Sequence, residues 1–244
     1  MNSKDITLYD VIDGTWPAAQ ITDIGPWQIR TGSGGGSRVS ATSARRVVTP
    51  DELPIAESAM RDLGQPMLFM IRAGDDALDA MLETRGYKIK DPVTMYRAPV
   101  SAIATVQPPP VTAFTVWEPL AIQIDIWAKG GISQARVDVM HRAKGPKTSL
   151  VGRLNDHPAA AGFVAIHAGV AMVHALEILP HQRRQNMGVY AMRRAAFWAQ
   201  SQGADHIACV CTTENTGANA LYASLGMEVV GQYHYRILEK DALL

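Results

Sequence analysis

The stretch Pro180–Gly188 (PHQRRQNMG) combines two arginines with a glycine at the point where a helix is expected to begin. The apolar residues before it predict a strand, and apolar spacing over Gly188–Gln202 predicts a helix. Backbone N–H groups at a helix start point at whatever lies there, and the helix dipole favours a negative charge. Arg183 and Arg184 add positive side chains. We therefore predict an anion site suited to a diphosphate; the alternative is a surface loop with two solvated arginines.

The positive charge of this stretch is local. The chain has 23 Lys and Arg and 23 Asp and Glu, so its formal net charge is zero. This balance excludes a protein that binds nucleic acid by neutralising phosphates over its whole surface. Hydrophobic residues make up 47% and charged residues 19% of the chain, which is enough apolar material for a folded core. We expect a globular protein without a nucleic-acid partner.

Cys209 and Cys211 lie two residues apart on a predicted strand. At that spacing both side chains point to the same face, where disulfide geometry is poor. We predict that they pack as small apolar residues; a redox or metal role is the alternative. His181 and His206 are isolated, so no metal site is predicted. The cysteine usage is typical of a reducing compartment, and we expect a cytoplasmic protein.

Residues 157–176 contain no Asp, Glu, Lys or Arg, and a segment of that length could span a bilayer. Gly162, Gly169 and three histidines interrupt it. We predict two buried strands instead, Ala161–Ile166 and Val170–Ile178, joined by a turn. The first residues of the sequence also lack the apolar core of a secretory signal, so no membrane partner is expected.

Three consecutive prolines, Pro108 to Pro110, favour extended backbone and stop helices and central strands. We predict a linker at 107–111 between an N-terminal domain, 1–106, and a C-terminal domain, 112–244. Both predicted domains fall within the ordinary size range of roughly 100–150 residues.

Each half alternates helices and strands, which predicts an α/β (α+β) fold with a mixed central sheet flanked by helices. In the N-terminal half we expect a strand at Pro26–Arg30, helices at Thr49–Leu63 and Asp76–Arg85, and strands at Met67–Arg72 and Tyr87–Pro99. The remaining elements of the C-terminal half are helices at Pro119–Lys129, Gln134–Lys144 and Ala218–Leu225 and strands at Thr148–Leu154, His206–Cys211 and Glu228–Leu238. The glycine cluster Thr31–Ser37 lacks the Lys and the following Ser or Thr of a phosphate-binding loop, so a flexible hairpin loop is expected there.

The order helix, Gly, strand, helix, Gly, strand occurs once in each half. One and the same shift along the sequence places Ala80 on Ala220 and Gly86 on Gly226. We interpret this as an internal duplication; the alternative is that any two α/β units share such an order.

The stretch Pro180–Gly188 resembles the R-x-x-G-x-G signature that opens a helix in the GNAT superfamily of acyl-CoA-dependent N-acyltransferases. Arg183 stands at the first position of the signature and Gly188 at the last, and Asn186 stands where the first glycine is usual. Asn is the non-glycine residue that best tolerates a positive φ, so the turn can be kept.

A second stretch, Asn215–Met227, is similar to the family pattern N-x-x-A-x-x-L-Y-x-x-x-G-F. Every position of that pattern matches except Met227, which replaces Phe. The resemblance covers about Ala113–Leu238, and it implies a GNAT fold.

The resemblance implies that acetyl-CoA is the cosubstrate and that the strand before the signature holds its pantetheine arm. In this family that strand splays from its neighbour, and backbone N–H groups near Leu176 and Ile178 are the candidates to bind the arm and polarise the thioester carbonyl. The pyrophosphate is expected on the backbone of the helix-opening segment, at Arg183, Arg184, Gln185, Asn186, Met187, Gly188 and Val189.

The resemblance places Tyr222 where the family commonly has the general acid that protonates the departing thiolate. The alternative is an aromatic side chain that packs on the sheet. Asn215 is expected to brace its loop or to contact the pantetheine arm; the alternative is an Asn that only forms a turn. Glu177 is the candidate general base, and the alternative is an exposed or salt-bridged strand residue. His174 or water alone are the other candidates for the base.

We therefore predict a GNAT N-acetyltransferase that moves an acetyl group from acetyl-CoA to a primary amine of a small molecule or peptide, by direct attack on the thioester. An active C-terminal unit would stand in tandem with a degenerate N-terminal unit, since nothing before the helix at Thr49–Leu63 resembles the signature. The acceptor amine, the length of the acyl chain, and the choice between monomer and homodimer stay open. A CoA-binding sensor or interaction module whose catalysis has lapsed is the alternative.

Overall fold

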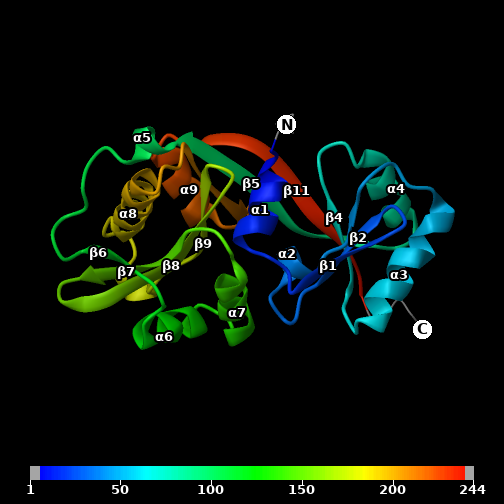
Figure 1. Cartoon of the computed structure of the whole chain (residues 1–244), viewed down its shortest axis with the longest axis horizontal. Helices are drawn as coiled ribbons and strands as arrows, with labels where there is room; N and C mark the ends of the chain where they lie inside the picture. Colours follow the sequence, from blue (N-terminus) through cyan, green and yellow to red (C-terminus); the bar gives the residue numbers. More distant parts are fainter. Residues whose placement is uncertain (1–5, 240–244) are drawn as a thin grey trace. The chain divides into compact units, whose positions relative to one another are not determined.

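The computed structural model describes residues 6–239, which form two compact units, each assembled from separated stretches of the chain (Figure 1). Unit 1 comprises the described residues up to Pro17 together with Met95–Cys211 and Asn215–Val230. Unit 2 comprises Ala18–Thr94, Thr212–Glu214 and the described residues from Gly231 onward.

The predicted linker at 107–111 runs inside unit 1. The prolines do interrupt regular structure, because they separate helix α5 (Val100–Ile103) from strand β6 (Ala113–Val116). The chain nevertheless stays bound to the unit, since the Thr112 carbonyl accepts a hydrogen bond from the Arg153 N–H at 2.8 Å. A proline run therefore ends elements here without separating two bodies.

Unit 1 contains most of the predicted C-terminal elements. Besides α5 and β6 it holds α1 (Leu8–Thr15), α6 (Ala121–Lys129), α7 (Gln134–Arg142), β7 (Lys147–Leu154), β8 (His157–His167), β9 (Val170–Ile178), the 3-10 turn η2 (Pro180–Gln182), α8 (Met187–Ser201), β10 (His206–Thr212), α9 (Thr216–Ser224) and the beginning of β11 (Glu228–Leu238).

The sheet of unit 1 is mixed, as predicted. Its strands follow the order β6, β7, β8, β9, β10 and then the end of β5 (Lys88–Pro99). Neighbours from β6 to β9 are antiparallel, and β9 and β10 are parallel. The charge-free residues 157–176 form β8 and most of β9, with Ala168 and Gly169 in left-handed conformation at the turn. The prediction of two strands in this stretch is confirmed.

Both faces of β8 and β9 are covered, because neighbouring residues along each strand pack on different helices. Val164 and Val173 belong to the core formed with α8, whereas Phe163 and His174 contact Trp16, which follows α1. Burial on both faces explains why these strands are apolar throughout rather than alternating. Helix α1 was not anticipated from the sequence.

Unit 2 contains the predicted N-terminal elements and three further short ones. They are β1 (Gln20–Ile24), β2 (Trp27–Thr31), α2 (Ser37–Ser40), β3 (Ser43–Ala44), the 3-10 turn η1 (Pro50–Glu52), α3 (Leu53–Asp62), β4 (Met67–Ile71), α4 (Asp76–Thr84), and the parts of β5 and β11 that belong to this unit. Strand β4 pairs antiparallel with the end of β11, where His234 lies opposite Ile71. The core of unit 2 includes Trp27, Phe69 and Tyr87, and the Phe69 ring meets each of the other two edge to face.

The glycine cluster Thr31–Ser37 connects β2 to α2 and β3, so it forms a loop, as expected. The tight hairpin turn of this region lies elsewhere, at Gly25 between β1 and β2. None of the helices within residues 6–239 is long and apolar enough to cross a membrane.

Candidate functional site

Strand β9 carries a bulge at Ala175 and Leu176, shortly before it ends at Ile178. Glu177 lies opposite Ala161 of β8 and His174 opposite Phe163, so two residues of β9 face the single residue Gly162. One of the two, Ala175, has a φ of 51°, which is rare for a residue with a side chain. Such a bulge bends the strand and redirects the backbone groups that follow it.

The indole of Trp127 on α6 holds this bulge. Its Nε1–H donates a 2.8 Å hydrogen bond to the Ala175 carbonyl oxygen, and the Trp127 side chain is fully buried. The left-handed conformation of Ala175 turns its carbonyl out of the ladder, and the indole supplies the donor that a buried carbonyl requires. Trp127 is thus a functional candidate that sequence reasoning missed.

Strand β9 separates from β10 at the bulge, as the family resemblance predicts. Their parallel register runs from His206–Val170 to Cys209–Val173, while β9 continues to Ile178 and β10 to Thr212. The Leu179 N–H donates to Ala159 on β8. Because donors alternate along an antiparallel strand, the N–H of Ile178 points to the other side, where β10 has diverged.

The loop before α8 contains two residues in left-handed conformation. Arg184 and Asn186 both adopt left-handed conformations, with φ of 63° and 64°. Alternation of left- and right-handed residues makes successive N–H groups converge into a concave nest, and here the nest leads directly into the N-terminus of α8. Asn186 fills the place where the signature usually has glycine, and its conformation is the one expected.

Arg183 ties this loop back to the end of β9. Its Nε donates to the Ile178 carbonyl at 3.0 Å, and its second guanidinium nitrogen lies 3.1 Å from the Glu177 carboxylate. The Glu177 side chain is 21% exposed and lies against Gly130, where an added Cβ would come within 2.7 Å of it. The candidate base is therefore held as an ion pair beside the bulge.

Gly188 lets two helices approach each other closely. A Cβ at this position would lie 2.8 Å from a Leu221 methyl carbon on α9 and 3.4 Å from Ile178. The neighbouring Met187, the first residue of α8, is buried, whereas Val189 is half-buried. Gly188 of the first signature therefore contacts Leu221 of the second, and a larger residue at position 188 would collide with the leucine side chain.

Tyr222 lies in a cluster of polar and sulfur-bearing side chains. Its ring centroid is 5.3 Å from that of Tyr96, whose hydroxyl donates to Asn219 at 2.7 Å, and Cys211 Sγ lies 3.3 Å from the same amide oxygen. Burial raises the pKa of Tyr222 well above its ordinary value, and Cys209 and Cys211 act in the same direction. The phenol therefore stays protonated near neutral pH, which is the state a general acid needs.

Both cysteines are free thiols, and Cys209 is fully buried in the unit 1 core. The prediction that they pack is confirmed in that respect. Within residues 6–239 no cluster of three or more His, Cys, Asp or Glu could hold a metal ion.

Asn215 caps helix α9. Its side-chain oxygen accepts from the Ala218 N–H at 3.0 Å, and its carbonyl accepts from Asn219. This geometry fits an Asn that braces its loop and equally one that only forms a turn. His174, the alternative base, is 3% exposed and hydrogen-bonded to Thr15 at 2.8 Å, as a core histidine would be.

Gln185 lies in the anion loop and its side chain turns back along it. The amide nitrogen donates to the His181 carbonyl at 3.3 Å. Leu176, the second residue of the bulge, packs partly into the core under α8. The structure thus gathers the residues from Leu176 to Val189 around one bulge and one helix start, with Tyr222 on a helix that contacts that start through Leu221.

Unit 1 thus combines a mixed sheet that has one bulged strand with a loop of two left-handed residues and the helix that follows it. Residues 119–227 match the acetyltransferase (GNAT) family. The chain is 25% identical over 233 residues to the uncharacterised N-acetyltransferase YobR of Bacillus subtilis (strain 168), covering 91% of this chain and 94% of that protein.

Two solved structures share the fold. One is a GCN5-related N-acetyltransferase from Kribbella flavida, with a TM-score of 0.67, 18% identity, and coverage of 93% of this chain and 92% of that one. The other is a tandem GNAT protein from the clavulanic acid biosynthesis pathway, with a TM-score of 0.62, 11% identity, and coverage of 82% and 75%. The matched segment, residues 119–227, holds both signature stretches, and together with the curated relative it indicates an N-acetyltransferase enzyme.

Proposed function

We propose that the chain transfers an acetyl group from acetyl-CoA to a primary amine of a small molecule or peptide, at the site built in unit 1. The observation that carries this proposal is the bulge at Ala175, because it opens β9 from β10 immediately before the anion loop. Acetyl-CoA would supply the acyl group as a thioester, and its shape fits an open strand edge that leads into a phosphate-sized nest.

The roles of the binding residues follow from their places. The nest and helix start, from Arg183 to Val189, would hold the pyrophosphate chiefly through backbone N–H groups, with Arg184 adding positive charge at an exposed position. The N–H of Ile178, and that of Leu176 in the bulge, would bind the pantetheine arm and polarise the thioester carbonyl. These donors sit on a rigid strand, so little reorganisation is needed when charge develops on the carbonyl oxygen.

The proton transfers are assigned to two side chains. Tyr222 would donate its phenolic proton to the departing thiolate, and Glu177 would accept a proton from the ammonium, directly or through water. The ion pair between Glu177 and Arg183 holds the Glu177 carboxylate at the end of β9. Direct attack needs no covalent intermediate on the protein.

Unit 2 is proposed as the degenerate partner of a tandem arrangement. It repeats the order α3, β4, α4, β5, which parallels α8, β10, α9, β11. In the 3-10 turn that leads into α3, the Glu52 carboxylate accepts a hydrogen bond from the Thr49 N–H and pairs with Arg46. A fixed negative charge therefore occupies the place where unit 1 would take a phosphate, and we propose that unit 2 does not bind CoA.

The test is release of free thiol from acetyl-CoA by the full chain, across a panel of alkylamines, amino acids, polyamines and peptide N-termini. Replacement of Tyr222 by Phe should lower kcat by roughly 10²–10⁴-fold, the usual contribution of a general acid. Tyr235→Phe is the matched control, since Tyr235 is also buried but belongs to unit 2. Turnover that Tyr222→Phe leaves intact would contradict the assigned role of the phenol.

A CoA-binding module without turnover is the second candidate. The engagement of Glu177 by Arg183 favours it, because the base is already paired. Calorimetry with CoA distinguishes the two: tight binding together with no thiol release on any amine would support the module and overturn the enzyme mechanism.

A further inference from the structure

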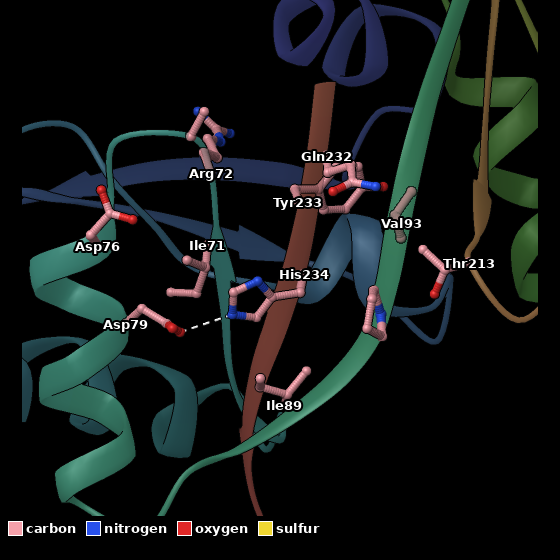
Figure 2. A pocket seen from close by; sticks show the side chains of 12 residues that line it. Ile71, Arg72, Asp76, Asp79, Ile89, Val93, Thr213, Gln232, Tyr233 and His234 are labelled. Atoms are coloured by element: carbon pink, nitrogen blue, oxygen red, sulfur yellow. Dashed lines mark hydrogen bonds and ion pairs between the residues drawn. The ribbon is translucent and has the colours of Figure 1, made fainter. Parts of the chain in front are cut away.

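Unit 2 contains a cavity of about 360 Å³ lined by residues from β4, α4, β5, β11 and the short segment around Thr213 (Figure 2). This volume lies at the lower end of the range for small-molecule sites, roughly 300–1,000 Å³. None of its lining residues belongs to the acetyl-transfer site described above. The cavity therefore has to be explained separately.

A histidine held by a carboxylate lies at its centre. His234 Nε2 is 2.8 Å from Asp79 Oδ1, and Arg236 binds the same carboxylate through Nε at 2.6 Å and a second nitrogen at 3.0 Å. The pKa of Asp79 is lowered, chiefly by the hydrogen bond from Arg236. An ionised carboxylate only accepts hydrogen bonds, so Nε2 of His234 carries the proton that is shared with it.

The tautomer of His234 fixes what the ring offers to the cavity. With the proton on Nε2, the neutral ring has a lone pair on Nδ1, which accepts a hydrogen bond. Figure 2 shows this second nitrogen facing away from Asp79, into the space below Gln232 and Tyr233. Arg236 pairs with the same carboxylate, so Asp79 holds the ring of His234 in place without adding an unbalanced negative charge to the cavity.

The rim of the cavity carries one charge of each sign. Asp76, at the start of α4, is exposed, and Arg72, just after β4, is partly exposed. The two side chains stand on the same side of the cavity in Figure 2. A ligand with only an ammonium or only a carboxylate would meet one favourable and one opposing charge here.

Part of the remaining wall is apolar, and Thr213 and Gln232 add polar groups to it. Ile71 forms part of it from β4, and Ile89 and Val93 form the opposite side from β5. Ile89 is a large aliphatic residue, yet 54% of its surface is exposed. A ligand that fills the cavity would bury this apolar surface, and that burial would favour binding.

We propose that this cavity is a binding site for a small zwitterion with an apolar side chain, of the α-amino acid class. The ammonium group is bound by Asp76 and His234 Nδ1, and the carboxylate by Arg72. The aliphatic or aromatic side chain packs between Ile71, Ile89 and Val93. The site is independent of acetyl transfer, and it gives unit 2 a ligand-binding role of its own.

The experiment is titration calorimetry on the full chain with leucine and phenylalanine, compared with isopentylamine and 4-methylpentanoate, which each lack one charged end. Saturable binding of an amino acid, at least tenfold tighter than either single-charge analogue, is the expected result. Equal binding of one analogue would overturn the zwitterion class. If none of the compounds shows saturable binding at concentrations up to about 10 mM, any dissociation constant must lie above that value. Binding would then be too weak to define a site, and the proposal would be overturned.

Variants place the ligand in the cavity. Asp76→Asn and Arg72→Gln should each weaken binding at least tenfold, and Ile89→Asp should abolish it by putting a charge in the apolar wall. Asp62→Asn and Arg61→Gln, two exposed residues at the end of α3 in the same unit, are the matched controls and should leave affinity unchanged. Loss of affinity in the controls, or none in the cavity variants, would refute the assignment. Because the readout is binding, its outcome does not depend on whether unit 1 turns over acetyl-CoA.

Discussion

Trp127→Phe should disturb the β9 bulge while leaving the residues proposed to bind the cosubstrate phosphates unchanged. The change removes the indole donor that meets the Ala175 carbonyl at 2.8 Å and leaves most of the aromatic packing in place. An unsatisfied buried carbonyl costs about 1–3 kcal/mol, so the free energy of unfolding should fall by that amount.

The effect on turnover should be larger than the effect on binding. The bulge aims the N–H groups of Leu176 and Ile178, and a shift of about 1 Å in such donors can cost on the order of 10²-fold in rate. We expect kcat to fall by roughly 10- to 100-fold while KM for acetyl-CoA changes by less than about threefold, because the nest at Arg183 to Asn186 is untouched.

The assay is steady-state thiol release on the amine that supports the highest turnover, together with urea unfolding of each variant. Trp198→Phe is the control: it shortens a partly buried tryptophan on α8 of the same unit, away from the bulge. A folded Trp127→Phe protein with unchanged kcat would refute the idea that the indole positions the strand. An equal loss in the Trp198 variant would point to general destabilisation instead.

Three further outcomes can be checked by unfolding and binding measurements. Asn186→Gly should keep the fold and bind CoA at least as well, whereas Asn186→Val should lose about 1–2 kcal/mol of stability, because a β-branched residue resists a φ of 64°. Gly188→Ala should cost about 1 kcal/mol in urea unfolding, since the Leu221 methyl group must move from 2.8 Å. Arg46 and the Thr49 N–H lower the pKa of Glu52 to about 2, so the stability that Glu52 contributes is present above about pH 4.5 and is lost as the pH falls toward 2; Glu52→Gln should flatten that part of an acid-unfolding curve.

Local patterns carried the prediction of the elements. Strands at Val170–Ile178 and Glu228–Leu238 have the bounds that the sequence indicates, and the helix expected from Gly188 begins one residue earlier. These elements are flanked by glycines or prolines and have clear apolar periodicity, so neighbouring residues alone decide them.

Which distant helices and strands pack together could not be predicted from local sequence patterns. Helix α1 belongs to unit 1 although its partners β8 and β9 come much later in the sequence, and β4 of unit 2 pairs with β11. No local pattern reports which distant strand will be a neighbour, so the division at 107–111 missed this exchange of segments.

The candidate site was predictable where a motif fixed the backbone. The left-handed conformation of Asn186 and the need for glycine at 188 follow from the signature. The bulge at Ala175 has no such signal, because alanine rarely takes a positive φ and does so here only with the tertiary support of Trp127.

Because each unit combines early and late segments of the chain, neither unit can fold until its late segments have been synthesised. During synthesis, α1 emerges first, yet the strands it covers follow only after roughly 150 further residues, about 10–30 seconds later at ordinary rates of translation. Unit 2 likewise lacks the partner of β4 until the last strand, β11, has been made. Unit 1 therefore cannot close before β8 to β10 have been made, and unit 2 cannot close before β11 has been made. Until then each unit exposes unpaired apolar surface, and the growing chain is open to association with other chains for much of its synthesis.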